Sequence, residues 1–147
     1  MYRSRESRKG TAATEFALVI PVLLILTFGT IEICSAMFLR QTLKIASYEG
    51  ARTAVRKRST TADVQDVVTD FLASRDVTGG SVTIDVDPAR TQILLPITVT
   101  VNAPINGNSI LPNGFYTWMR NRNISSATCM YKEFIHPDYE AELAAGS

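Results

Sequence analysis

The spacing of hydrophobic residues changes twice along the chain. Residues 16–38 form an almost uncharged apolar run in which Glu32 is the single charge. From Leu39 onward, apolar and small residues recur at three- and four-residue steps, as they do along one face of a helix: Leu39, Leu43, Ala46, Gly50 and Ala54. We therefore predict one helix from about Ala12 to Lys57, roughly 70 Å long. Pro21 removes one backbone hydrogen bond from it, which predicts a kink or local melting.

A second, amphipathic helix is expected after a break at residues 58–61. Thr60 and Asp63 have capping-box spacing, with Asp in place of the usual Glu or Gln. The apolar stripe that follows consists of Val64, Val67, Val68, Phe71 and Leu72. We predict that this helix ends near Arg75 and that Gly79 and Gly80 make the next turn.

The period then shortens to two, which indicates strands. Residues 82–87 and 93–101 alternate apolar and polar positions, and residues 123–133 give a third strand. Pro96 indicates a bulge or an edge position, and the odd-numbered face of the second strand should be buried. The sum is an α+β fold in which a long helix and a short amphipathic one pack on a small antiparallel sheet.

The segments between and after these strands lack regular periodicity. Residues 102–121 contain an aromatic cluster of Phe115, Tyr116 and Trp118, which either covers an open end of the core or binds a partner. The residues from Ile135 onward form a tail.

The apolar run is long enough to cross a membrane. A bilayer core about 30 Å thick needs roughly 20 mostly apolar helical residues. Residues 16–38 supply 23, of which 13 are Leu, Ile, Val or Phe. At roughly −0.3 to −0.6 kcal/mol each, these outweigh the roughly +2.5 to +3.5 kcal/mol of Glu32. A cleaved secretory signal is the alternative, but the run exceeds the usual length of about 7 to 15 residues and no Ala-x-Ala site follows. We predict a retained anchor.

Glu15 stands at the start of this membrane helix. A carboxylate there is costly unless a partner neutralises it. If the chain were cut after Gly10, the new amino group of Thr11 would lie one helical turn from Glu15. That amine would give the carboxylate a partner.

The first 60 residues resemble the TadE-like family of minor pseudopilins, which belong to type IVb and Tad pilus systems. The resemblance rests on a short basic leader, on Gly10, Glu15 and Phe16, and on three segments: residues 10–21, 28–32 and 49–52. It implies that a prepilin peptidase cuts between Gly10 and Thr11 and that Glu15 and Phe16 register neighbouring subunits. It also implies that Pro21 loosens the helix.

The same resemblance implies a place in the cell and a set of partners. The expected protein is a single-pass component of the bacterial inner membrane, with its carboxyl-terminal domain outside the cytoplasm and a place in an extracellular pilus after assembly. Its expected partners are prepilin peptidase, other pilins and pseudopilins, the inner-membrane assembly platform and membrane lipid. We divide the chain into a leader (1–10), a transmembrane helix (11–38), its exported continuation (39–58), a head (59–134) and a tail (135–147).

Charge adds little to this assignment. Four basic residues in the leader favour a cytoplasmic amino terminus, but more basic residues follow the anchor, so charge counting leaves the orientation open and the resemblance decides it. The net charge of +1 argues against a nucleic-acid-binding protein. An uncleaved, membrane-anchored binding domain that faces the cell envelope is the alternative function.

Catalytic and metal chemistry are not expected. The single histidine, His136, lies in the predicted tail, where it would be a poorly placed base. Cys34 and Cys129 are too few for a zinc site, and we expect separate apolar packing rather than a disulfide. Asp85 and Asp87 should be solvated on a strand face rather than bind calcium. We expect no cofactor. Glu32 either reaches water at the membrane boundary or pairs within the membrane with a neighbour's Arg40 or with another pilus component.

Overall fold

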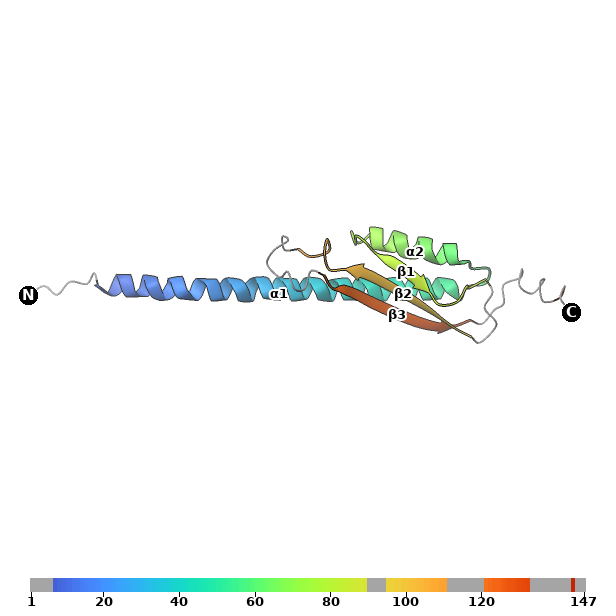
Figure 1. Ribbon diagram of the computed structural model, residues 1–147, viewed down its shortest axis with the longest axis horizontal. Coiled ribbons are helices and arrows are strands. Elements are labelled where there is room, and N and C mark those ends of the chain that lie inside the picture. The colour runs from blue at the N-terminus through green and yellow to red at the C-terminus, as the bar shows by residue number, and fades with distance from the viewer. Residues whose placement is uncertain (1–6, 90–94, 111–120, 133–143, 145–147) are drawn as a thin grey trace, which may run out of the picture.

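The long amino-terminal helix dominates the molecule. The computed structural model describes residues 7–89, 95–110, 121–132 and 144. Its first element, α1, spans Ser7–Ala54 without interruption, which corresponds to about 70 Å. Figure 1 shows α1 as a shaft whose carboxyl-terminal half lies against a small head, whereas its amino-terminal half projects beyond the head. The predicted single helix is confirmed, although both of its ends lie a few residues earlier.

The helix continues through Pro21. The local melting predicted at this residue is therefore absent from the structure, and the kink stays a prediction. Helix α1 ends at Ala54, and the chain then turns toward the next helix through residues 55–59, where Arg58 adopts a left-handed backbone conformation with a φ of 65°. Two short turns make up this segment, in which the amides of Arg56 and Ser59 donate to the carbonyls of Thr53 and Arg56.

The second helix, α2, spans Thr61–Ala73 and begins with the predicted capping box. The Thr60 hydroxyl accepts from the amide of Asp63 at 3.3 Å, and an Asp63 carboxylate oxygen accepts from the amide of Thr60 at 2.8 Å. Val64, Val68 and Leu72 are buried, while Val67 lies at the edge of the apolar stripe and is exposed. The helix ends two residues before the predicted Arg75.

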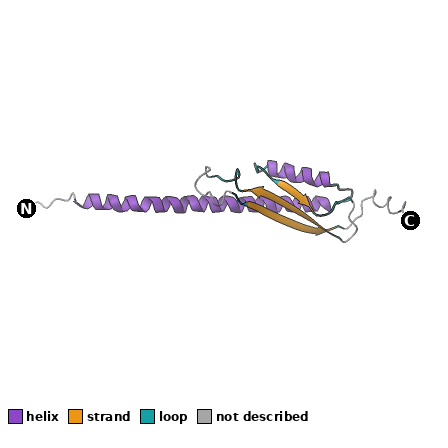
Figure 2. Ribbon diagram, viewed as in Figure 1, coloured by secondary structure: helices purple, strands orange, loops and turns teal. Residues whose placement is uncertain are grey.

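Three antiparallel strands form one sheet in the order β1-β2-β3, with bounds Ser81–Ile84, Pro96–Pro104 and Asn123–Tyr131. The strands lie beside the distal half of α1, and α2 completes the head (Figure 2). The expected α+β fold is thereby confirmed. In β2, Ile97, Val99, Val101 and Ala103 are buried, so the odd-numbered face is the core face, as predicted.

Three details of the strand prediction are wrong. The second strand continues to Pro104, three residues into the segment predicted to be a loop. The first strand ends at Ile84, because Asp85 and Asp87 bind backbone and hydroxyl groups instead of continuing the alternation. Asp85 accepts from the amide of Thr98 at 2.7 Å, and Asp87 accepts from the amide of Ala89 at 3.0 Å and the hydroxyl of Thr61 at 3.1 Å. Pro96 begins the central strand rather than making a bulge or lying at an edge, and the first residue of a strand is a position that tolerates proline.

The core lies where α1 meets α2 and the sheet. Leu43, Ala46 and Gly50 on α1 face Val64 and Val68 on α2 and the odd residues of β2. One polar contact crosses this region, where the Ser47 and Thr128 hydroxyls lie 2.8 Å apart and join α1 to β3. Lys132, directly after β3, is fully buried and donates from Nζ to the Pro88 carbonyl. Burial lowers the pKa of the Lys132 ammonium, and the negative charge of Asp87 opposes that shift.

Several predicted features lie outside the described residues. They are the leader up to residue 6, the aromatic cluster at 115–118, Glu133 and His136. The remainder of the tail is likewise outside, apart from Ala144.

Candidate functional site along the exposed half of α1

Residues 10–27, in the amino-terminal half of α1, form an exposed apolar surface that projects beyond the described head. Every residue from 10 to 27 is exposed, including large side chains such as Leu18, at 76%. Within the described part of the chain, α1 is also the one helix long and apolar enough to cross a membrane. Exposed apolar surface of this extent is expected to be covered by lipid or by other helices.

Gly10 and Thr11 lie near the start of this surface. Both are within α1, where the Thr14 hydroxyl donates to the Thr11 carbonyl at 2.8 Å. Gly10 is exposed, and a Cβ atom added to it would have no neighbouring atom within 4 Å. The peptide bond between these residues is therefore unobstructed by the described head, although an enzyme that cleaves it must first unwind the beginning of the helix.

Glu15 and Phe16 project from the same exposed segment. Both are exposed, and among the described residues no cation lies within ion-pair distance of the Glu15 carboxylate. Glu15 lies four residues after Thr11, so their side chains share one face of the helix. In a bilayer this carboxylate would need a partner from outside the described structure.

Glu32 is buried against the head, which contradicts one of the two predictions made for it and leaves its pairing with another subunit a prediction. Its side chain is 6% exposed, and both carboxylate oxygens accept from the Ser109 hydroxyl, at 2.9 and 2.7 Å. The expected exposure to water is therefore wrong, and the carboxylate bonds a serine of its own head. An isolated acid in an apolar helix indicates that a partner is needed. The sequence could not identify that partner, because Ser109 is 77 positions away in the chain.

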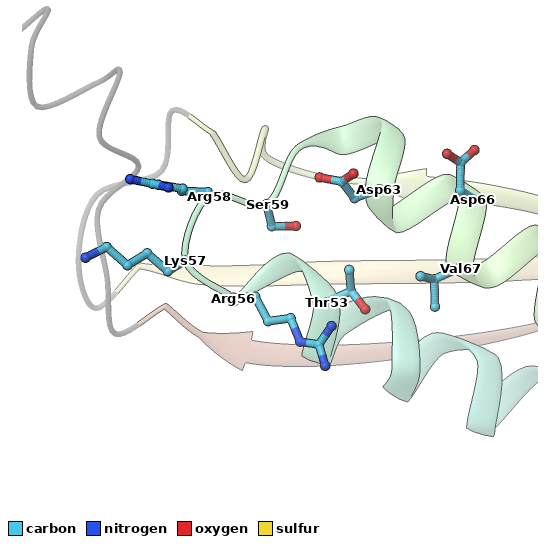
Figure 3. Close-up of a pocket in the computed structure, with 8 residues that line it drawn as sticks. All are labelled: Thr53, Arg56, Lys57, Arg58, Ser59, Asp63, Asp66 and Val67. Atoms are coloured by element: carbon cyan, nitrogen blue, oxygen red, sulfur yellow. The ribbon is translucent and has the colours of Figure 1, made fainter.

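A pocket of about 350 Å³ lies at the far end of the head, between the end of α1 and the start of α2. Ser59 is buried, and its hydroxyl has no hydrogen-bond partner among the described residues. Figure 3 shows the side chains of Lys57 and Arg58 extending away from the direction in which the Ser59 hydroxyl points. Asp63, which also lines the pocket, already binds Thr60. The basic groups do not converge, so the pocket lacks the arrangement of an anion site.

The cysteines differ from their predicted environment. Both Cys34 and Cys129 are free and exposed, so apolar packing is wrong for both side chains. Cys34 follows the exposed side of α1, and Cys129 belongs to the odd, outward set of β3 residues. No group of three or more potential metal ligands occurs among the residues that the structure describes.

Comparison with known protein families gives a match to the segment of the chain that forms most of α1. Residues 10–52 match the family model described as TadE-like protein, which confirms the resemblance over that segment. The match covers less than half of the 147 residues and coincides with most of α1. No curated protein and no solved structure matches the chain.

Proposed function

We propose that this chain is a minor pseudopilin processed by a prepilin peptidase. Its match to the TadE-like model indicates a protein related to Tad pili, which supports this proposal. It would act in the assembly of an adhesive pilus at the bacterial inner membrane. The observation that supports this most directly is Glu15, an acid without a described partner on an apolar helix surface, one turn after Thr11.

The proposed processing creates the missing partner. Hydrolysis of the Gly10–Thr11 peptide bond adds water across it, leaving a carboxylate on the leader and an amine on Thr11. An α-amino group has a pKa of about 7.7 to 8.0 and is mostly charged at neutral pH. That amine would face the Glu15 carboxylate of a neighbouring subunit when two exposed apolar helices pack together, because an ion pair in lipid stabilises only where both charges meet.

The remaining parts of the molecule follow from this role. The exposed half of α1 would pass from lipid into contact with other pilins or pseudopilins, and the inner-membrane assembly platform would assist this transfer. Phe16 would pack where two such helices meet. The head would lie outside the cytoplasm and contact other subunits. Nothing in the proposal requires catalysis, a cofactor or nucleic acid.

The test is the identity of the mature amino terminus. The full chain is expressed with and without an active prepilin peptidase, and its terminus is read by sequencing and intact mass. We expect Thr11 as the first residue only with the peptidase, and Gly10→Ala should leave the precursor uncut. Glu15→Ala should be cut but fail to enter pili. Gly29→Ala, in the same helix but remote from the cut, should be processed like the natural chain.

A retained Met1 or Tyr2, in cells where the peptidase cleaves a known prepilin, would overturn the proposal. It would favour the alternative, an uncleaved single-span anchor that carries a binding domain.

A further inference from the structure

Strand β3 leaves one edge of the sheet open. The strand order places β3 at the end of the sheet, paired on one side with β2. Among the described residues, no segment pairs with its other side. The edge is nine residues long, whereas β1 at the opposite edge has four.

The pairing register identifies which backbone groups face outward. Ile105 donates to the Arg122 carbonyl and Lys132 donates to the Leu95 carbonyl, at the two ends of the β2–β3 ladder. Hydrogen-bonded pairs in an antiparallel ladder recur at every second residue, so the even residues of β3 bond β2. The amides and carbonyls on the open edge then belong to Asn123, Ser125, Ala127, Cys129 and Tyr131.

This edge lacks the features that usually prevent strand addition. Soluble domains protect long edges with charged residues, proline or bulges. Residues 123–131 contain no charged residue, proline or glycine, and the strand pairs with β2 without interruption. An extended segment of another chain can therefore bond to it through backbone groups alone.

Charge on the neighbouring flank of α1 restricts the segment that fits. The hydrogen bond between Ser47 and Thr128 shows which side of α1 lies under β3. Lys44 is one turn before Ser47 on that side, and Arg40 is one further turn back. Both side chains are exposed, and neither has an ion-pair partner among the described residues. A strand added to β3 would point alternate side chains toward this flank of α1, so that two of them would meet these two cations.

We infer that the open edge of β3 binds an extended segment of a different protein chain that carries acidic side chains at alternate positions. Its backbone pairs with the odd residues of β3, and its acids face Lys44 and Arg40. This inference rests on the sheet edge and the flank of α1, so it is independent of cleavage at Gly10.

A second copy of β3 is a poor occupant. Its residues include no acid to meet Lys44 and Arg40. Strand β3 also runs along the distal half of α1 (Figure 1), so antiparallel pairing of two copies would orient their α1 helices in opposite directions. Two copies anchored in one membrane cannot adopt that arrangement.

Amide hydrogen exchange tests the inference on the full chain in detergent micelles. The probe is a synthetic peptide that alternates glutamate and valine, and the matched control peptide carries lysine in place of glutamate. We expect the glutamate peptide to slow exchange at Ser125, Ala127 and Cys129 by about tenfold at saturation. The lysine peptide should have no effect.

Three variants separate edge pairing from other binding. Ala127→Pro removes an outward amide but no bond to β2, so the sheet should remain folded by circular dichroism while the protection is lost. Lys44→Glu combined with Arg40→Glu should reverse the preference in favour of the lysine peptide. The control variant is Arg75→Glu, which changes a charge just after α2 and away from β3. This variant should bind the glutamate peptide as the natural chain does.

Each contrary result overturns the inference. Absence of protection at these amides would show that the edge takes no strand. Protection that survives the reversal of Lys44 and Arg40 would show that acidic side chains do not select the occupant. Protection without peptide would show that the chain's own tail covers the edge or, if it depends on protein concentration, that a second copy does.

Discussion

Gly50 is the point at which α1 approaches both α2 and the sheet. A Cβ atom added there would lie 2.7 Å from Cγ2 of Val68 and 3.0 Å from Cγ1 of Val99. Both valines are fully buried and β-branched, so they have little freedom to move. We expect Gly50→Ala to lower the free energy of unfolding, because overpacking costs about 1 to 3 kcal/mol and the gain in helix propensity is about 1 kcal/mol at most.

Denaturant unfolding of the head, followed by circular dichroism in detergent, measures this effect. Gly10→Ala is the matched control, because the space around Gly10 is open and the head should unfold as in the natural chain. The two substitutions should therefore have different effects: Gly50→Ala should destabilise the fold, whereas Gly10→Ala should prevent cleavage. An unchanged midpoint for Gly50→Ala would show that the valines can move apart.

At the scale of the element, α2 depends on its first turn. The amide of Thr60 and then its hydroxyl hold the pKa of the Asp63 carboxyl below its usual value. Such a group stabilises the folded state above its unfolded pKa, near 3.9, and that contribution disappears as the pH falls through the folded pKa. We expect Thr60→Ala to lower the free energy of unfolding by about 1 kcal/mol at pH 7. Asp63→Asn should lower it as well.

The pH dependence distinguishes the cap from other causes. Unfolding midpoints of the natural chain and of Asp63→Asn, compared between pH 7 and pH 2, should approach each other as the pH falls, because protonation removes the charge of Asp63. Asp66→Asn, on the same helix but outside the capping box, serves as the control. A difference that persists undiminished at low pH would contradict the role of the carboxylate.

At the scale of the whole molecule, the Glu32–Ser109 contact connects the head to the shaft close to the predicted membrane boundary. Ser109 belongs to the segment that follows β2, and its hydroxyl reaches the buried carboxylate. Removal of that hydroxyl leaves buried acceptors unsatisfied, which costs about 1 to 3 kcal/mol. We expect Ser109→Ala to loosen residues 105–110 from α1, whereas Glu32→Gln keeps an acceptor and should preserve the contact.

Hydrogen exchange over residues 105–110 reports this contact directly. Faster exchange in Ser109→Ala but not in Glu32→Gln is the expected pattern. Ser125→Ala, which removes a hydroxyl from the exposed face of β3, is the control for a general effect of losing a serine. Equal exchange in all three variants would show that the contact does not hold the segment.

The periodicity of apolar residues was sufficient to predict which face is buried in those helices and strands that have one face in the core. The odd residues of β2 and the stripe on α2, apart from the exposed Val67, were predicted correctly, because a shift of one residue would turn a whole apolar set toward water. Strand ends were less predictable. Asp85 fits the alternation of β1, yet it bonds the amide of Thr98, a partner 13 residues away.

The apolar run, the capping box and the positions of Gly10 and Glu15 are local in the chain, so the sequence by itself determined the long helix, the start of α2 and the family resemblance. The partners of Glu32, the burial of Lys132, the close approach at Gly50 and the open edge of β3 were decided only by the tertiary structure. Each of these features depends on which distant segments come together. The burial and the hydrogen bonds of a side chain are set by those neighbours, so they could not be read from the local sequence.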